Sequence, residues 1–498
     1  MRNKACFVVL LGAVVVMLTP CFVCAFGEDT PADLVLYSPE SQGLIPLGPA
    51  IMVDDVDFVP SGKQEGIGVC ITEDGKVAYS AHRVGGLRMY DIHMNNIPWA
   101  KDADGSNWVL YFDDEGNPFP KGSASGVKIK ANLFGPGWGI GSYTASVQTP
   151  SLAVAQSLGQ TPILQLFQND GTPIVPAKCG VPEDFAAAAG DIRIGDFDFL
   201  SNGNIVTIGE SRQLDENINL FGVPEALAGN VIVLSIMKPD EQFPTVHFGR
   251  LTEEPTRSET WHGLGVTQNG FAARVFKGAS TGAVLRFFQN DGTPLTGDVP
   301  LTQFGEGEIA GVLGTGTGRG DQQGWHGDGG SRYILASLDY LDLGYIIGSA
   351  PFVGIFSEFG DLIVGPVHVT GGPDGWSWVD GSLDDGRIDA ALQSDPATGR
   401  FICVWADKAF LGLEAGILMG RIFEADGTPL TKMIALDNHF DIGLMEQAGL
   451  SRRPRVVWRG NKIAVAWVTT NFDENPNQMC TLRTFTFGEE AVSDFMLY

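Results

Sequence analysis

Short apolar runs along the chain come in pairs, and each pair flanks a glycine-containing turn. Five segments show this pattern clearly: residues 67–79, 197–208, 264–275, 390–405 and 456–467. Gly and Asn supply the positive φ angles that tight turns between antiparallel strands require. Each segment therefore predicts a β-hairpin.

A second unit ends in an aromatic residue followed by an acidic turn. Phe-Gln-Asn-Asp-Gly-Thr-Pro occurs at residues 167–173 and again, unchanged, at residues 288–294, and residues 423–429 are a third copy with two changes. The Asp-Gly pair favours a tight turn, and the proline limits pairing in the strand that follows. The aromatic or apolar anchors of this unit recur with a period of about 50 to 70 residues, typical of propellers and repeat arrays.

One period contains both units and hence four strands, and the anchors give about seven periods. The chain is therefore predicted to be all-β, a β-propeller of seven four-stranded blades over residues 61–498. Residues 34–43 look like an extra copy of the second unit, so eight blades is the alternative. An open ring would leave two unpaired sheet edges. We expect the segment 26–60 to close the ring, with residues 33–53 beside the last blade near residues 481–497.

The repeat resembles those of secreted bacterial β-propeller proteins, in which a strand ending in Val-Trp precedes one ending in Phe-x-x-Asp-Gly-x-Pro. Residues 401–405, Phe-Ile-Cys-Val-Trp, followed by residues 421–429 carry this likeness best, and residues 463–467 are a second instance. The resemblance covers most of residues 61–498. It implies the fold and no particular activity, because one fold hosts many functions.

Residues 1–25 have the features of a secretory signal peptide. Arg2 and Lys4 precede an apolar stretch, and Val-Cys-Ala at residues 23–25 is a suitable cleavage site. The apolar stretch is too short for a membrane span, and no later stretch is long enough. We expect a secreted, periplasmic or cell-surface protein without an integral membrane segment after cleavage. Lipidation at Cys21 or Cys24 fits less well, since neither follows a small residue.

Four cysteines remain after cleavage: Cys70, Cys179, Cys403 and Cys480. They are too few for a disulfide scaffold, and none lies in a Cys-x-x-Cys motif. Cys70 and Cys403 lie within apolar strand patterns, which favours buried thiols. The alternative is that two of the four form one disulfide in an oxidising compartment, and the sequence does not assign the partners.

Net charge narrows the class of partner. The chain has a formal charge of −27, and loss of Arg2 and Lys4 with the signal peptide takes it to −29. Nucleic acids and anionic membranes select basic surfaces, so neither is expected as a partner. The charge is compatible with divalent cations, a basic partner or simple solubility, and we expect a monomer.

Trp-His-Gly occurs twice, at residues 261–263 and 325–327, in successive repeats and each time at the start of a first strand. If the copies are equivalent, His262 and His326 lie at one mouth of the central channel, with Asp389 and Arg452 at similar places in later blades. The four are candidates for a catalytic, metal or substrate site. The alternative is a packing motif, in which Trp fills the gap between blades and His bonds to a backbone carbonyl.

Acidic turns suggest a second kind of site. Four aspartates have the spacing of part of a calcium loop but lack its closing glutamate: Asp102, Asp104, Asp113 and Asp114. The recurrent Asp170, Asp291 and Asp426 are explained by turn geometry, because Asp accepts hydrogen bonds from nearby backbone N–H groups. Calcium thus remains the alternative to turn chemistry.

Trp376 and Trp378 could stack on a sugar or simply anchor a long loop. No phosphate-binding loop, Gly-x-Ser-x-Gly or His-Glu-x-x-His motif is present, and no cofactor signature is found. Residues 394–399 only approximate the Ser-x-Asp-x-Gly-x-x-Trp box of sialidase-like propellers. The sequence therefore favours a non-enzymatic scaffold that binds a protein or a glycan. The alternatives are an extracellular carbohydrate hydrolase or lyase using the channel mouth, and a calcium-stabilised structural surface protein.

Overall fold

The computed structural model is all-β with almost no helix, as the turn-rich pattern of the sequence predicted. It describes residues 37–52, 64–83, 106–112, 118–119, 127–129, 140–142, 151–158, 161–168, 173–179, 191–212, 231–249, 263–276, 283–300, 325–327, 332–342, 347–369, 390–407, 417–437, 450–470 and 478–488, apart from positions 49, 72–74, 76, 242, 245 and 396. Residues 1–25, which were predicted to be a signal peptide, lie outside these ranges.

The described strands form seven antiparallel sheets, numbered here in chain order. Sheet 1 contains β3 (Gln64–Ile71), β4 (Val77–Arg83), β5 (Ser106–Phe112) and β6 (Pro118–Phe119), with β7 (Val127–Ile129) also beside β5. Sheet 2 contains β8 (Ile140–Ser142), β9 (Ser151–Leu158), β10 (Thr161–Gln168) and β11 (Pro173–Cys179). Sheet 3 contains β12 (Asp191–Phe199), β13 (Ile205–Arg212), β14 (Val231–Met237) and β15 (Val246–Gly249).

The remaining sheets repeat the same order. Sheet 4 contains β16 (Gly263–Val266), β17 (Gly270–Phe276), β18 (Ala283–Gln289) and β19 (Val299–Pro300). Sheet 5 contains β20 (Trp325–Gly327), β21 (Arg332–Asp342), β22 (Ile347–Ser357) and β23 (Leu362–His368). Sheet 6 contains β24 (Ala390–Ser394), β25 (Phe401–Asp407), β26 (Ile417–Phe423) and β27 (Ile434–Asp437). Sheet 7 contains β28 (Leu450–Arg459), β29 (Lys462–Thr470) and β30 (Gln478–Phe487), with β1 (Leu44–Pro46) and β2 (Ile51–Met52) paired to β30.

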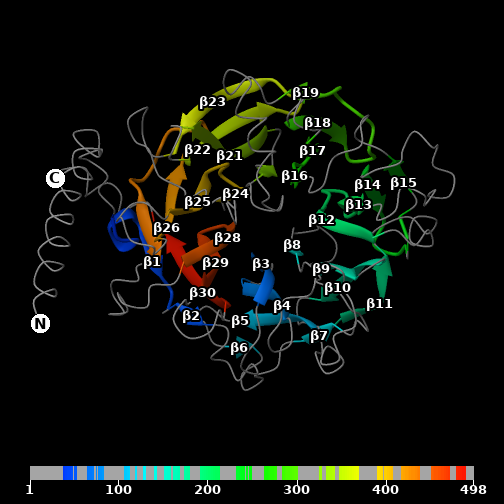
Figure 1. Cartoon of the computed structure of the whole chain (residues 1–498), viewed down its shortest axis with the longest axis horizontal. Coiled ribbons are helices and arrows are strands. Elements are labelled where there is room, and N and C mark those ends of the chain that lie inside the picture. Colours follow the sequence, from blue (N-terminus) through cyan, green and yellow to red (C-terminus); the bar gives the residue numbers. More distant parts are fainter. Residues whose placement is uncertain are drawn as a thin grey trace, which may run out of the picture.

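The first strand of each sheet lies toward a common centre, and the later strands lie outward (Figure 1). Each first strand contacts the first strands of its two neighbours, in the order β3, β8, β12, β16, β20, β24 and β28, and β28 in turn contacts β3. The sheets therefore succeed one another around the centre in chain order.

The three copies of the heptapeptide occupy the same place in their sheets. Each begins at the end of the third strand, and its aromatic residue pairs with the proline six positions later: Phe167 with Pro173, Phe288 with Pro294 and Phe423 with Pro429. Gly292 and Gly427 have φ angles of 86° and 85°, the left-handed region that glycine enters at little cost. Sheet 5 makes the same turn with Gly360, whose φ is 86°.

Space is a second reason for glycine at this turn. A Cβ atom on Gly427 would lie 3.1 Å from Cγ1 of Val364 on β23, in the preceding sheet. A Cβ atom on Gly360 would lie 2.7 Å from Cγ2 of Val299 on β19, again one sheet earlier. The turn glycine thus brings each sheet into close contact with its predecessor.

The hydrophobic core lies between neighbouring sheets. One cluster joins Val353 and Ile355 of sheet 5 to Phe401, Cys403 and other buried residues of sheet 6. Trp405 and Trp467, on the second strands of sheets 6 and 7, are 0% and 1% exposed. Cys403 is a buried free thiol, as predicted; the side chains of Cys70, Cys179 and Cys480 lie outside the described part.

The N-terminal segment pairs with the last strand of the chain. Leu44 of β1 is the register partner of Phe487, and Ile51 of β2 is the partner of Leu482. Tyr37, however, forms a parallel bridge with Ile434 of β27. We expected the whole segment beside the last blade, so this bridge is a difference. It arises because the 3₁₀ turn η1 (Glu40–Gln42) and left-handed Gly43 redirect the chain from sheet 6 to sheet 7.

Candidate functional site

The turns that follow the innermost strands lie on one rim of the molecule, which we call the turn rim. Three side-chain hydrogen bonds join such turns across neighbouring sheets. Ser201 Oγ donates to the Gln268 carbonyl at 2.6 Å, Gly460 N donates to Asp395 Oδ1 at 3.2 Å, and Lys462 Nζ donates to the Gly75 carbonyl at 2.6 Å. Because innermost strands end at the turn rim, their first residues lie at the opposite rim, here called the strand-start rim.

Three of the four candidate catalytic residues, His262, Asp389 and Arg452, belong to the strand-start rim by chain position, whereas His326 lies one residue before Gly327, at the turn end of its strand. His262 and Asp389 immediately precede β16 and β24 and lie outside the described residues. His326 is in β20, opposite Ile334, and Arg452 is in β28, opposite Val468, but only their backbone positions are described. Sheets 4, 6 and 7 thus carry a candidate near the start of the innermost strand, and sheet 5 carries one near its end. A meeting of the four side chains stays a prediction.

The two Trp-His-Gly copies do not occupy equivalent positions. Phe271 and Tyr333 are equivalent, since each pairs with the aromatic anchor of its third strand, and their partners on the first strands are Val266 and Gly327. Gly327 ends the second motif, whereas Val266 lies three residues beyond the first. The expected equivalence is therefore wrong, because pairing with the neighbouring strand, and not the motif, sets the register.

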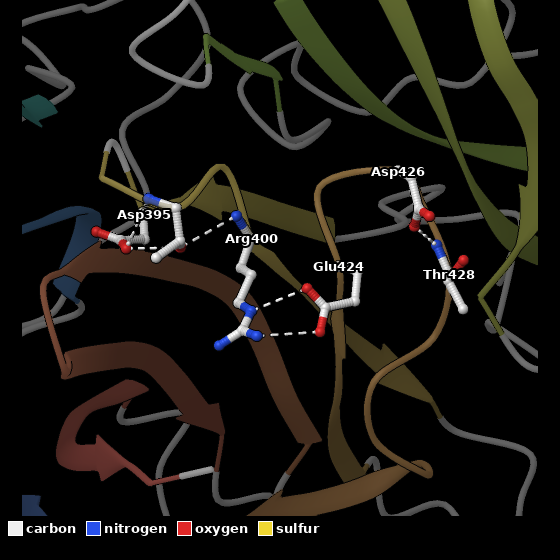
Figure 2. A network of polar contacts seen from close by, with 6 residues as sticks. Asp395, Arg400, Glu424, Asp426 and Thr428 are labelled. Carbon is white, nitrogen blue, oxygen red and sulfur yellow. Dashed lines mark hydrogen bonds and ion pairs between the residues drawn. The ribbon is translucent and has the colours of Figure 1, made fainter.

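Asp395 is the buried centre of a polar network on the turn rim (Figure 2). Its Oδ2 accepts hydrogen bonds from Thr398 N at 3.2 Å and Thr398 Oγ1 at 2.7 Å, and its Oδ1 accepts one from Ala397 N at 3.4 Å. Together with Gly460 N of sheet 7, these donors compensate the burial of the carboxylate. The turn between β24 and β25, which carries Asp395, is thus joined to the β28–β29 turn of sheet 7.

Arg400 and Glu424 form a two-pronged ion pair in the same network (Figure 2). Arg400 Nε donates to Glu424 Oε2 at 2.9 Å, and Arg400 Nη2 donates to Oε1 at 3.1 Å. The pair connects the β24–β25 turn to the β26–β27 turn. Both side chains are partly exposed, so the expected gain in stability is modest, about 1 kcal/mol or less.

The repeated aspartates serve their own turns. Asp291 Oδ1 accepts a hydrogen bond from Thr293 N at 2.8 Å, and Asp426 Oδ1 accepts one from Thr428 N at 2.9 Å. These backbone bonds lower the pKa of both carboxyls. Asp170 of the first copy lies outside the described residues. The arrangement is the one that turn chemistry predicts.

Metal ligation was the other hypothesis for acidic turns. Within the ranges that the structure describes, no group of three or more His, Cys, Asp or Glu side chains is placed to hold a metal ion. The candidate ligands Asp102, Asp104, Asp113 and Asp114 all lie outside those ranges, as do Trp376 and Trp378.

Arginines two positions before the aromatic anchor are a feature that sequence reasoning missed. Arg421 is buried; its Nε donates to the Thr431 carbonyl at 2.9 Å and its Nη1 to the Val369 carbonyl at 2.6 Å, just beyond β23 of the preceding sheet. Burial lowers its pKa. Arg483 Nη1 likewise donates to the Leu436 carbonyl of sheet 6 at 3.2 Å. Arg-x-Phe before the acidic turn, also present at Arg286, is the signal that could have revealed these links between sheets.

No helix in the described part of the chain is both long and apolar enough to span a bilayer. No protein-family model matches the chain, and no curated protein matches it in sequence. Solved structures of propeller type do resemble it at low sequence identity.

Three solved structures illustrate the similarity. A protein of unknown function from Dyadobacter fermentans is 9% identical, with 91% of this chain and 97% of that chain covered and a TM-score of 0.39. The hemagglutinin-neuraminidase ectodomain of parainfluenza virus 5 is 8% identical, with 98% and 97% covered and a TM-score of 0.40. A Trypanosoma rangeli sialidase is 10% identical, with 86% and 55% covered and a TM-score of 0.39. Similarity at this level carries no argument about function.

Proposed function

We propose that the chain is an exported seven-bladed β-propeller, closed by residues 26–60, that acts as a binding scaffold for a glycan or a protein. The observation that carries the proposal is the cyclic contact of the seven first strands, including the contact of β28 with β3. With the pairing of β1 and β30, this order supports a ring in which each sheet is one blade. Export rests on the signal-peptide pattern of residues 1–25.

The strand-start rim is the proposed binding face. On the turn rim, several polar side chains are engaged in hydrogen bonds within turns and between sheets, as at Asp395, Arg400 and Ser201. On the strand-start rim the connections are long; one runs from Pro300 to Trp325 and another from Val369 to Ala390. Long loops on a rigid scaffold are where binding residues concentrate. Trp376 and Trp378 lie in the second of these connections and supply aromatic surfaces suited to sugar rings.

A carbohydrate hydrolase or lyase is the second candidate. One observation favours it: titratable or cationic residues occur near the first-strand starts of sheets 4, 6 and 7, at His262, Asp389 and Arg452, and His326 lies on the first strand of sheet 5. Proton transfer to or from a glycosidic bond needs such groups within hydrogen-bonding reach of one another. A structural protein stabilised by calcium is the third, and it depends on Asp102, Asp104, Asp113 and Asp114 acting as ligands.

A glycan array probed with the mature protein tests the binding function. Trp376→Ala with Trp378→Ala should weaken binding of any retained glycan at least about tenfold, because stacking on aromatic rings would be lost. The matched turn-rim control is Phe359→Ala, whose parent side chain is 59% exposed; it should bind as the wild type does. Equal loss in both variants, or binding that only the control loses, would overturn the assignment of the face.

Activity and metal assays separate the alternatives. Release of reducing ends or unsaturated sugars from bound polysaccharides, abolished by Asp389→Asn or by His326→Ala, would establish the enzyme. Arg452→Ala would be compared with Lys238→Ala, an exposed cation on the turn rim. A melting temperature that falls on addition of EDTA would support the calcium hypothesis, and an unchanged one would remove it.

A further inference from the structure

Residues 37–52, here called the strap, attach to the outer edges of two sheets. At one end Tyr37 N donates to the Met433 carbonyl at 3.0 Å, and Ala435 N donates to the Tyr37 carbonyl at 3.0 Å, along β27 of sheet 6. Beyond Gly43 the strap pairs with β30 of sheet 7, where Leu47 N donates to the Thr484 carbonyl at 2.9 Å. In Figure 1 this blue segment lies beside the orange and red strands of both sheets.

Two strap side chains reach into the joint between these sheets. Leu44 is fully buried in a cluster that includes Leu436 of sheet 6 and Phe485 of sheet 7. Gln42 is 5% exposed, and its Oε1 accepts a hydrogen bond from Lys432 N at 2.9 Å. The strap therefore supplies an apolar side chain and a backbone cap as well as main-chain pairing.

Loss of the strap would leave matching vacancies on both sheets. The outer edges of β27 and β30 would become unpaired strand edges, which readily accept another strand. The site left by Leu44 would favour an apolar side chain, and Lys432 N would need an acceptor. Main-chain pairing combined with specific side-chain pockets is how strand addition achieves affinity and selectivity.

We propose that the strap is an exchangeable strand, and that the outer edges of sheets 6 and 7 form a peptide-binding site specific for the sequence of residues 37–52. The strap connects to sheet 1 only through the segment between Met52 and Gln64. Cleavage within that segment would convert the strap into a bound peptide that a copy supplied in trans can replace. The inference rests on the strand pairing and is independent of any ligand at the strand-start rim.

The experiment uses the full mature chain with a specific protease site inserted between Met52 and Gln64. The folded protein is cut, mixed with excess fluorescent peptide 37–52, and separated from free peptide on a sizing column. The wild-type peptide should replace the resident strap and co-elute with the protein. A Leu44→Ala peptide should compete at least about tenfold less well, because Leu44 loses buried contacts. The matched Ile45→Ala peptide should compete within about threefold of wild type, since Ile45 is 50% exposed.

A second variant, which lacks the strap, tests the proposal even if the resident strap dissociates too slowly to be replaced. The chain beginning at residue 53 is produced, and its melting temperature is measured with and without each peptide. Stabilisation by the wild-type and Ile45→Ala peptides, but not by Leu44→Ala, is expected. If this chain does not fold alone, recovery of folded protein on addition of the wild-type peptide is the equivalent result. Exclusion of the wild-type peptide from both proteins, or equal binding of all three peptides, would overturn the proposal.

Discussion

The ring of Phe423 lies flat on the ring of Phe401, with centroids 5.0 Å apart and planes 8° apart. The two residues are register partners on β26 and β25. Sheet 4 repeats the arrangement, with Phe288 stacked on Phe271 at 4.9 Å and 12°. The aromatic residue that opens the acidic turn is thus also half of a stacked pair in the core between sheets.

Truncation of one ring of this stacked pair should lower the stability of the fold. Phe423→Ala would remove a fully buried ring and leave a cavity, with an expected loss of about 3 to 5 kcal/mol in the free energy of unfolding. Chemical denaturation followed by circular dichroism measures the loss. Phe359→Ala removes an exposed ring and should change stability by about 0.5 kcal/mol or less. Similar losses in the two variants would contradict the described packing.

The turn glycine should resist substitution. Gly427→Ala forces an alanine to a φ of 85° and places its Cβ 3.1 Å from Val364. The expected cost is about 1 to 3 kcal/mol. Gly297 is the matched control, because nothing lies within 4 Å of a Cβ built there, and Gly297→Ala should be neutral or slightly stabilising. Equal melting temperatures for the two variants would show that the turn does not pack on sheet 5.

Acid should weaken the turns built on Asp291 and Asp426. Their pKa values are lowered in the folded state by backbone hydrogen bonds. A lowered pKa contributes stability above the unfolded-state value of 3.8, and this stability is lost as pH falls through the folded-state pKa. The wild type should therefore melt above the Asp291→Asn/Asp426→Asn variant at neutral pH, and the gap should close below pH 3.8. A difference in melting temperature that grows as the pH falls would contradict this prediction.

Cys403 should be inert while the protein is folded. Burial raises the pKa of its thiol to about 12, and the thiolate is the reactive form. Iodoacetamide at pH 8, followed by peptide mass spectrometry, should leave Cys403 unlabelled in native protein and labelled in guanidinium chloride. Labelling at equal rates in both conditions would place the thiol at the surface.

The local pattern of the sequence was sufficient for the hairpins and for the equivalence of the acidic turns. Asp-Gly between apolar runs specifies a turn wherever it occurs, as Gly292 and Gly427 show. The register of the innermost strands was not predictable in this way. His262 and His326 share a motif, yet the two motifs differ by three residues in their register relative to the second strand of the sheet. Pairing with the second strand decides this register.

Contacts between sheets were the hardest to foresee. Arg421 donates a hydrogen bond to the carbonyl of Val369, 52 positions away along the chain. Every residue has a backbone carbonyl, so the sequence does not identify the acceptor. The bridge from Tyr37 to Ile434 was missed because the prediction considered only pairing between the two chain ends, which placed the whole N-terminal segment at sheet 7. In the structure, η1 and Gly43 divide this segment between two sheets.

The central claim of the proposed architecture is that pairing of β1 with β30, as strands of one sheet, closes the ring. Ile45 and Thr486 are register partners on β1 and β30, and facing residues of paired strands lie within disulfide range. Ile45→Cys with Thr486→Cys is the test pair. Thr470→Cys with Gln478→Cys, partners on β29 and β30, is the positive control, and Ile45→Cys with Ile363→Cys, on different sheets, is the negative control.

Mild oxidation of the folded mature protein, followed by mass spectrometry of non-reduced peptides, is the decisive measurement. The account predicts a 45–486 disulfide that forms as readily as the 470–478 disulfide, with no 45–363 product. A chain in which 470–478 forms while 45–486 does not would contradict the closed ring.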